Sequence, residues 1–171
     1  MDHAGEYGAI RIYQAQRLLA KWRASDLLPF LDHTLEDERR HRVTFERLMW
    51  ERRIMPCRTL AFWGVGGMIL GLVTGALGRA AVLICTEAVE RTVHRHLEDQ
   101  IRWLASRDPL IAEAITAIQV EELEHLQFAA ARSEGPGQSG LDKLIVGAME
   151  ALIWLSTYGA SSRMAKQLAA E

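Results

Sequence analysis

A carboxylate and an imidazole three residues apart on a predicted helix are the groups best suited to chemistry in this chain. Glu122 and His125 have this spacing, which places both side chains on one helix face about one turn apart. The other residues on that face, at intervals of three and four, are Ile111, Ile115, Ile118 and Ala129. The pair therefore takes the place of core residues, and both polar groups are predicted to point into the interior.

The same arrangement occurs a second time in Glu38 and His41. The other members of that stripe are Leu31, Thr34, Phe45 and Leu48. A further glutamate precedes each pair at one distance, because Glu6 lies 32 residues before Glu38 and Glu90 lies 32 residues before Glu122. A single Glu-x-x-His is usually part of a solvated helix face, but two copies in register are not expected of surface charges.

Four inward carboxylates and two inward imidazoles are the ligands of di-iron and di-manganese carboxylate proteins. In the ferritin-like four-helix bundle, two helices each give one Glu and two others each give Glu-x-x-His. Two divalent metals also neutralise four carboxylates, which are very costly to bury unpaired. We therefore predict an all-α, ferritin-like four-helix bundle with six metal ligands: Glu6, Glu38, His41, Glu90, Glu122 and His125.

Prolines and a capping residue divide the chain into the helices that must position these ligands. We expect the first two helices at about 2–23 and 29–54, the second with Pro29 in its first turn. A third ligand-bearing helix is expected at about 79–106. The fourth should begin at Pro109 with Asp108 as its N-cap.

The remaining segments carry no predicted ligand. The Gly-, Pro- and Ser-rich stretch 133–140 is the clearest loop, and a last helix is expected at about 141–167. Residues 59–78 are uncharged and almost wholly apolar, just long enough to span a bilayer. A bundle that holds ligands from both flanks must fold on one side of a membrane. We therefore expect this insert to lie on the bundle or dip into one leaflet.

An interfacial membrane contact is the predicted role of these apolar segments. Three arginines, Arg52, Arg53 and Arg58, stand at the start of the insert, where they are expected to meet anionic head groups. Trp63 is expected to face lipid, together with the apolar part of the last helix around Ile153 and Trp154.

Length, charge and cysteine content narrow the class of protein. The 171 residues suit a single domain, 1–171, that buries a core without disulfides. A net charge of −2 argues against nucleic acid as a partner. Cys57 and Cys85 lack CxxC spacing and are expected to be free thiols in a reducing compartment. No targeting segment precedes Glu6, so a cytoplasmic chain, or a trimmed form of a longer one, is expected.

Nearly the whole chain resembles one family, the demethoxyubiquinone hydroxylases of ubiquinone biosynthesis. Residues 2–9 (DHAGEYGA), followed by 11–13 (RIY), look like the opening motif of that family. Residues 88–90 (AVE), 100–102 (QIR) and 121–125 (EELEH) are similar to its later motifs. The opening motif is far more specific than Glu-x-x-His, which many di-iron proteins share.

The resemblance implies an O2-dependent di-iron monooxygenase whose iron ligands are the six residues named above. Its cofactors would be two Fe ions, with O2 as co-substrate and an external reductant such as NADH, and its substrate a polyprenylated methoxy-benzoquinol. It also implies a peripheral, monotopic membrane protein that binds a lipid-binding accessory protein and forms homo-oligomers. The expected location is the cytoplasmic face of the cell membrane in a bacterium, or the matrix side of the mitochondrial inner membrane in a eukaryote.

The chain departs from the family pattern at three positions. Ile10 stands where Asn is expected, Leu97 where Tyr is expected after His96, and Glu87 where an apolar residue is expected. Glu87 lies one turn before Glu90, where it would add a seventh carboxylate near the metals. His94 and His96 have two interpretations, as histidines with no functional role or as hydrogen-bond partners of the substrate.

Two other classes of function remain open at this point. A ferritin-like protein that oxidises or stores iron would use similar ligands, but soluble shells of that kind need no lipid-facing segment. A small integral membrane protein with surface Glu and His residues would explain the apolar run, but not the doubled spacing.

Overall fold

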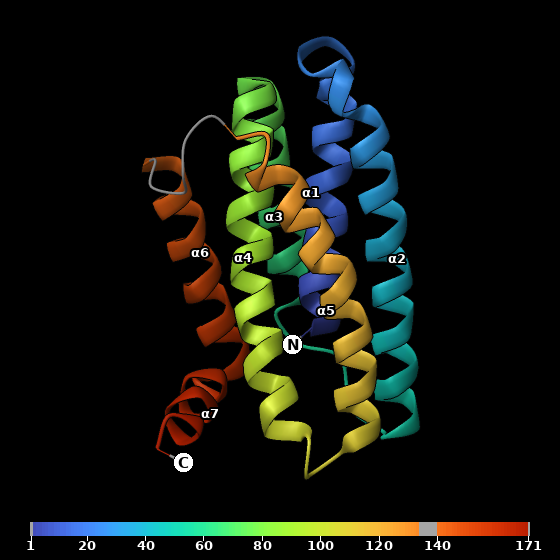
Figure 1. Ribbon diagram of the computed structural model, residues 1–171, viewed down its shortest axis with the longest axis vertical. Helices are drawn as coiled ribbons and strands as arrows, with labels where there is room; N and C mark the ends of the chain where they lie inside the picture. Colours follow the sequence, from blue (N-terminus) through green and yellow to red (C-terminus); the bar gives the residue numbers. More distant parts are fainter. Residues whose placement is uncertain (1, 134–139, 171) are drawn as a thin grey trace. The chain divides into compact units, whose positions relative to one another are not determined.

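The computed structural model describes residues 2–133 and 140–170, and these residues form helices and turns without any strand. The elements are α1 (Asp2–Arg23), the 3₁₀ turn η1 (Ser25–Leu27), α2 (Leu28–Glu51), α3 (Leu60–Leu77), α4 (Arg79–Leu104), α5 (Pro109–Ala130), α6 (Gly140–Thr157) and α7 (Ala160–Leu168) (Figure 1). The all-α prediction is confirmed. The ferritin-like four-helix bundle stays a prediction.

The starts of the ligand-bearing helices follow the sequence signals. Pro29 lies in the first turn of α2, and Pro109 begins α5. The Asp108 side chain accepts a hydrogen bond of 3.2 Å from the Ile111 N–H, which confirms the predicted N-cap.

Two helix ends differ from the prediction. Helix α2 ends at Glu51 instead of residue 54, because Arg53 adopts a left-handed conformation with φ 55°. The Ile54 N–H then donates to the Met49 carbonyl at 2.9 Å and closes the helix end. The prediction of a single last helix at about 141–167 was wrong as well. Tyr158 and Gly159 have φ of 50° and 72°, and the chain bends by 100° between α6 and α7.

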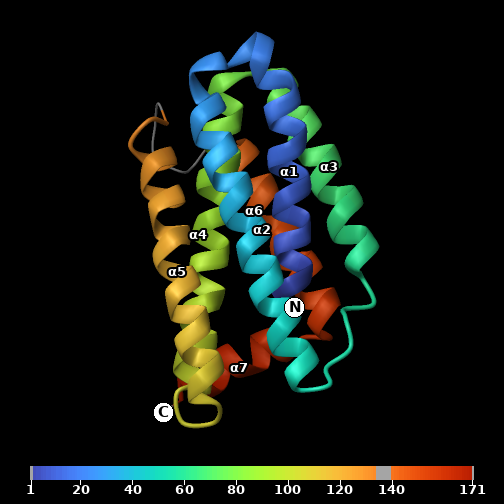
Figure 2. The same ribbon diagram turned by 90° about the vertical axis from the view of Figure 1, so that its right-hand side faces the viewer.

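The chain consists of two compact units, Met1–Leu83 and Ile84–Glu171. In the first unit α1 packs against α2 and α3, and Figure 2 shows α3 running alongside α1. Glycines allow this close approach. A Cβ added at Gly67 or Gly71 would collide with the carbonyl oxygen of Gly8 or Ile12 in α1. The contacts advance in the same direction along both helices, so α1 and α3 are parallel.

A buried polar contact lies among the glycines of α3 that pack against α1. Gln16 and Thr74 are fully buried, and the Gln16 amide donates to the Thr74 hydroxyl at 2.9 Å. The Thr74 hydroxyl in turn donates to the Leu70 carbonyl at 2.8 Å. Although it is polar, the Gln16 side chain is therefore part of the contact between α1 and α3.

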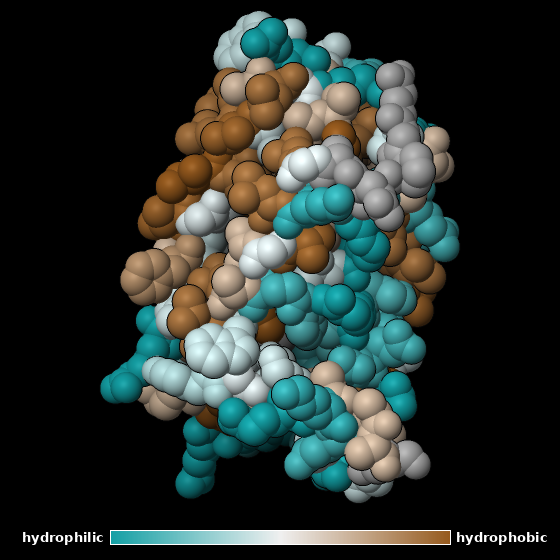
Figure 3. Space-filling model, turned by 90° about the vertical axis from the view of Figure 1, so that its left-hand side faces the viewer, coloured by the Kyte–Doolittle hydropathy of each residue, from teal (hydrophilic) through white to brown (hydrophobic). Residues whose placement is uncertain are grey.

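The other face of α3 is apolar and exposed, and we call it the outer face. Exposed apolar side chains such as these are brown in Figure 3. Its members are Phe62, Val65, Ile69, Leu72, Val73 and Leu77. Among the described helices α3 alone is by itself long and apolar enough to cross a membrane, while α6 and α7 pass that test only as one bent pair.

The outer face does not include Trp63, which was expected to face lipid. Trp63 is only 7% exposed, and its ring packs against Gly8 of α1. Near the end of α6, Trp154 is exposed as expected, but Ile153 is buried. The sequence therefore identified the apolar segments correctly but assigned the wrong faces to two side chains.

Candidate metal centre

In the first unit, three of the predicted ligands converge from two helices. Glu6 on α1 is 5% exposed, and Glu38 and His41 on α2 are 1% and 3% exposed. Each of the three offers a ligand atom within 4.8 Å of those of the other two. His41 Nδ1 lies 3.9 Å from Glu6 Oε2. We call these residues the first triad.

In the second unit, the other three predicted ligands converge in the same way. Glu90 on α4 and Glu122 and His125 on α5 are 1%, 1% and 3% exposed, and their ligand atoms also lie within 4.8 Å of one another. His125 Nδ1 lies 3.5 Å from Glu122 Oε2. This second triad has the same composition as the first, namely two glutamates and one histidine.

The donors of both triads fit a divalent transition metal. Carboxylate oxygens and an imidazole nitrogen suit iron or manganese, whereas the absence of cysteine from both triads disfavours softer metals. With a neutral histidine each triad carries a formal charge of −2, which one divalent ion neutralises. Without such a charge, two carboxylates this deeply buried would be strongly unfavourable.

A comparison with protein families shows which family this chain belongs to. Residues 1–156 match the model of the family described as "Ubiquinone biosynthesis protein COQ7". The chain belongs to the COQ7 family.

Individual proteins are also similar to this chain over most of its length. A Rhodospirillum rubrum protein named 3-demethoxyubiquinol 3-hydroxylase is 35% identical over 158 residues, which cover 91% of this chain and 74% of the relative. A mouse protein named NADPH-dependent 3-demethoxyubiquinone 3-hydroxylase, mitochondrial, is 33% identical over 162 residues, or 91% and 74% of the two chains. The yeast 5-demethoxyubiquinone hydroxylase, also mitochondrial, is 32% identical over 144 residues, or 75% and 62%.

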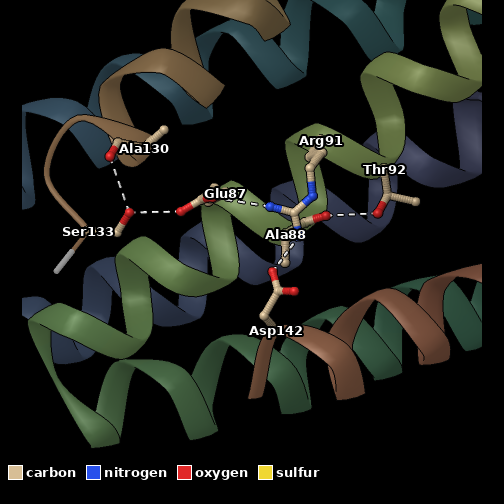
Figure 4. A network of polar contacts seen from close by, with 7 residues as sticks. All are labelled: Glu87, Ala88, Arg91, Thr92, Ala130, Ser133 and Asp142. Atoms are coloured by element: carbon tan, nitrogen blue, oxygen red, sulfur yellow. Dashed lines mark hydrogen bonds and ion pairs between the residues drawn. The ribbon is translucent and has the colours of Figure 1, made fainter. Parts of the chain in front are cut away.

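Glu87, which stands where the resemblance predicts an apolar residue, forms an ion pair with Arg91. Its Oε1 accepts from Arg91 at 3.1 Å, and its Oε2 accepts from the Ser133 hydroxyl at 2.7 Å. Arg91 also donates to Asp142 at the start of α6 (Figure 4). Both carboxylate oxygens of Glu87 are therefore engaged by donors, and the side chain links α4 to the residues that follow α5.

The other departures and the two additional histidines lie on α1 and α4. Ile10 and Leu97 are both buried apolar residues. His96 Nε2 lies 3.1 Å from Glu150 Oε1 on α6, and Arg95 pairs with the same carboxylate. The His94 carbonyl accepts from Gln119 on α5 at 3.3 Å. His96 is therefore engaged by an acidic residue of its own unit.

Sequence reasoning gave no role to Asp37, which adjoins Glu38 on α2 and is 2% exposed. Asp37 Oδ1 accepts from Arg40 at 2.6 Å, and His33 Nδ1 lies 2.8 Å from Asp37 Oδ2. All three residues belong to one helix at spacings of three and four, a pattern visible in the sequence. Asp37 is therefore a second buried carboxylate on α2 beside Glu38, and it pairs with Arg40 and His33 of its own helix.

Proposed function

We propose that this protein is an O2-dependent di-iron monooxygenase that hydroxylates the ring of a polyprenylated methoxy-benzoquinol in ubiquinone biosynthesis. The observation that carries the proposal is the pair of buried Glu-Glu-His triads in a member of the COQ7 family. The bacterial, mouse and yeast relatives are named for hydroxylation of demethoxyubiquinol or demethoxyubiquinone, which supplies the substrate class.

The six triad residues would hold two irons, which supply O2 activation and oxidation of the ring when bound. The carboxylates would neutralise the charge of the metal, and the imidazoles would complete the donor set. Burial of all six side chains keeps bulk water away from the reacting atoms. Hydroxylation replaces a ring C–H by C–OH with one atom of O2, while the other atom leaves as water and consumes two electrons.

The two electrons must come from an external reductant. The mouse relative is named NADPH-dependent, which favours a nicotinamide nucleotide as the donor. The family resemblance implied an external reductant such as NADH, a nucleotide of the same class.

A second part of the proposal concerns access to the substrate. A polyprenyl quinol partitions into the bilayer, so the protein must work at a membrane surface. The outer face of α3 supplies exposed apolar side chains for one leaflet, and the exposed Arg53 and Arg58 precede it. We propose that the protein docks on the membrane through this face without spanning it.

The decisive experiment is a single reaction with labelled oxygen. The protein is reconstituted with Fe(II) without air and then given isotopically labelled O2, reductant and a short-tail demethoxyubiquinol. We expect one labelled oxygen atom in the product, and no product from metal-free protein. If the protein instead retains many irons per chain as mineral and forms no hydroxylated quinol, iron storage is its function and the hydroxylase proposal is wrong.

A further inference from the structure

Two arginines share one tyrosine ring in the first unit. The guanidinium carbon of Arg11, one turn along α1 from Tyr7, lies 5.1 Å from the Tyr7 ring centroid. Arg42 reaches the same ring from α2 at 4.8 Å. Cation–π attraction holds each guanidinium in place, and both guanidinium carbons lie within 5.1 Å of one ring centroid.

Neither arginine forms a salt bridge with a carboxylate of the described residues. Among residues 2–133 and 140–170, no aspartate or glutamate forms an ion pair with Arg11 or Arg42. Glu46, one turn beyond Arg42 on α2, is exposed and unpaired with it. Two neighbouring cations without an acidic partner favour binding of an anion.

Some N–H groups of these arginines remain available to bind such an anion. Arg11 donates through Nε and Nη2 to the Tyr7 hydroxyl, at 3.3 and 2.8 Å, and through Nη1 to Gln14 at 3.3 Å. Arg42 donates only through Nε, at 3.4 Å to His3 Nε2. A guanidinium has five N–H groups, so four of those on Arg42 have no protein acceptor among the described residues. Their planar fork matches the oxygens of a phosphate.

The position of the cluster indicates which phosphate it would meet. The Tyr7 ring packs directly on Gly64 of α3, so closely that a side chain at Gly64 would collide with it. Phe62 and Val65, on either side of Gly64, are 69% and 61% exposed and belong to the outer face. The two arginines therefore lie at the edge of an exposed apolar surface, where a lipid would place its head group if its acyl chains covered that surface.

We propose that Arg11 and Arg42, held on the ring of Tyr7, bind the phosphate of an anionic lipid head group at the edge of the outer face. The inference rests on the membrane docking proposed above and adds a defined head-group site to it. A soluble nucleotide carries phosphate as well, but it has no acyl chain to cover the adjacent apolar side chains. The site therefore differs from a general attraction between basic residues and a charged surface.

The test compares two single-charge variants of the iron-loaded protein on vesicles at physiological salt. Arg42→Gln removes the arginine with free donors, whereas Arg39→Gln removes an exposed arginine of the same helix that makes no ion pair among the described residues. On vesicles with equal parts of phosphatidylcholine and phosphatidylglycerol, Arg42→Gln should weaken binding about fivefold. Arg39→Gln should weaken it by less than about twofold, since salt screens unspecific attraction.

A conservative substitution of Arg42 and the hydroxylase activity of the variants provide two further measurements. Arg42→Lys keeps the charge but loses the planar fork, so its affinity for the mixed vesicles should lie between those of wild type and Arg42→Gln. On phosphatidylcholine alone, wild type and Arg42→Gln should differ little. All variants should keep the wild-type iron content and the wild-type rate on a short-tail quinol in detergent, which tests the hydroxylase independently of lipid.

Three outcomes would overturn the head-group site. Equal losses for Arg42→Gln and Arg39→Gln would mean that only net charge matters. Full affinity of Arg42→Lys would mean that the fork is not used. An increased KM for NADPH in detergent, with unchanged vesicle affinity, would assign the cluster to the nucleotide. In each case an active wild type would leave the hydroxylase proposal intact.

Discussion

Because the triad glutamates are buried, their negative charge affects the stability of the folded chain. A carboxylate that is 1% exposed, as in Glu38, Glu90 and Glu122, has lost nearly all contact with water. Burial of a negative charge to this degree favours a positive charge close by. We therefore expect the same side chain to act as a ligand when metal is present and to lower the stability of the fold when metal is absent.

Removing one triad carboxylate should lower metal binding. We expect wild type to bind two irons per chain, and Glu38→Ala or Glu122→Ala to retain at most about one, held weakly. Elemental analysis after gel filtration measures this. The matched controls are Glu36→Ala on α2 and Glu113→Ala on α5, both exposed on the same helices. Unchanged stoichiometry in Glu38→Ala and Glu122→Ala would show that the triads are not the metal site.

His3 makes the stability of the fold sensitive to pH. Its pKa lies below the ordinary value of 6.5, first because burial disfavours the imidazolium and second because Arg42 is close, while Glu46 acts in the opposite direction. The unfolded chain therefore takes up a proton near pH 6.5 that the folded chain resists. This contribution to stability is complete above that pH and is lost as the pH falls toward the lower folded pKa.

Replacing His3 should remove this loss. The free energy of unfolding of His3→Gln should fall less steeply than that of wild type as the pH drops below 6.5. Urea unfolding at a series of pH values gives both slopes. Parallel slopes for the two proteins would mean that His3 titrates alike in the folded and unfolded chains.

At the scale of single residues, the sequence correctly predicted which of the triad side chains are buried. Helical periodicity is a local property, so it identified all six triad residues as inward-facing before any contact was known. Contacts between distant residues are not local. The pairing of Glu87 with Ser133, 46 positions away, therefore could not be predicted, and the sequence placed Glu87 only as a further carboxylate near the metals.

Helix α3 has two faces with different physical demands. Its inner glycines let the α1 backbone approach, whereas Gly66 on the outside has no atom within 4 Å of an added Cβ. Gly67→Ala and Gly71→Ala should therefore destabilise the fold by about 1–3 kcal/mol. Gly66→Ala should stabilise it by about 0.5–1 kcal/mol, because alanine favours the helix.

Chemical unfolding of the three alanine variants tests this difference between the faces. A gain in stability at all three positions would indicate that the close packing of α1 on α3 does not persist in solution.

The outer face of α3 should govern attachment to vesicles. Phe62→Glu or Ile69→Glu replaces an exposed apolar side chain by a charge, and we expect vesicle affinity to fall about tenfold or more for each. Leu110→Glu, at an equally exposed apolar position on α5, is the control and should have little effect. Co-sedimentation with vesicles measures all three. Wild-type affinity in both α3 variants would refute docking through this face.

The limits of sequence reasoning about elements are visible at helix ends and faces. Capping and proline signals placed the start of α5 correctly, because they act within one turn. The break at Tyr158 and Gly159 was missed, since a glycine in an otherwise helical pattern is compatible with a continuous helix. Trp63 was assigned to lipid because an apolar run around the whole helix does not reveal which side packs against α1.

For the molecule as a whole, metal and folding should be coupled. Ions that bind only the folded chain stabilise it, by about 2.7 kcal/mol at a concentration one hundred times the Kd. Adding Fe(II) without air, or Mn(II), should therefore raise the Tm of metal-free protein. The rise should be smaller in Glu122→Ala. An unchanged Tm with either metal would mean that the buried triad carboxylates do not need a cation.

The hydrogen bond between Gln16 and Thr74 has a consequence for the alignment of two helices. Glycine and apolar contacts alone would tolerate a slip of α3 along α1 by one turn, about 5.4 Å. Such a slip would leave the buried Gln16 amide without its acceptor, a penalty that glycine packing does not impose. The bond thereby selects one register, and this register sets how far Glu6 lies along the helix axis from the exposed side chains of α3.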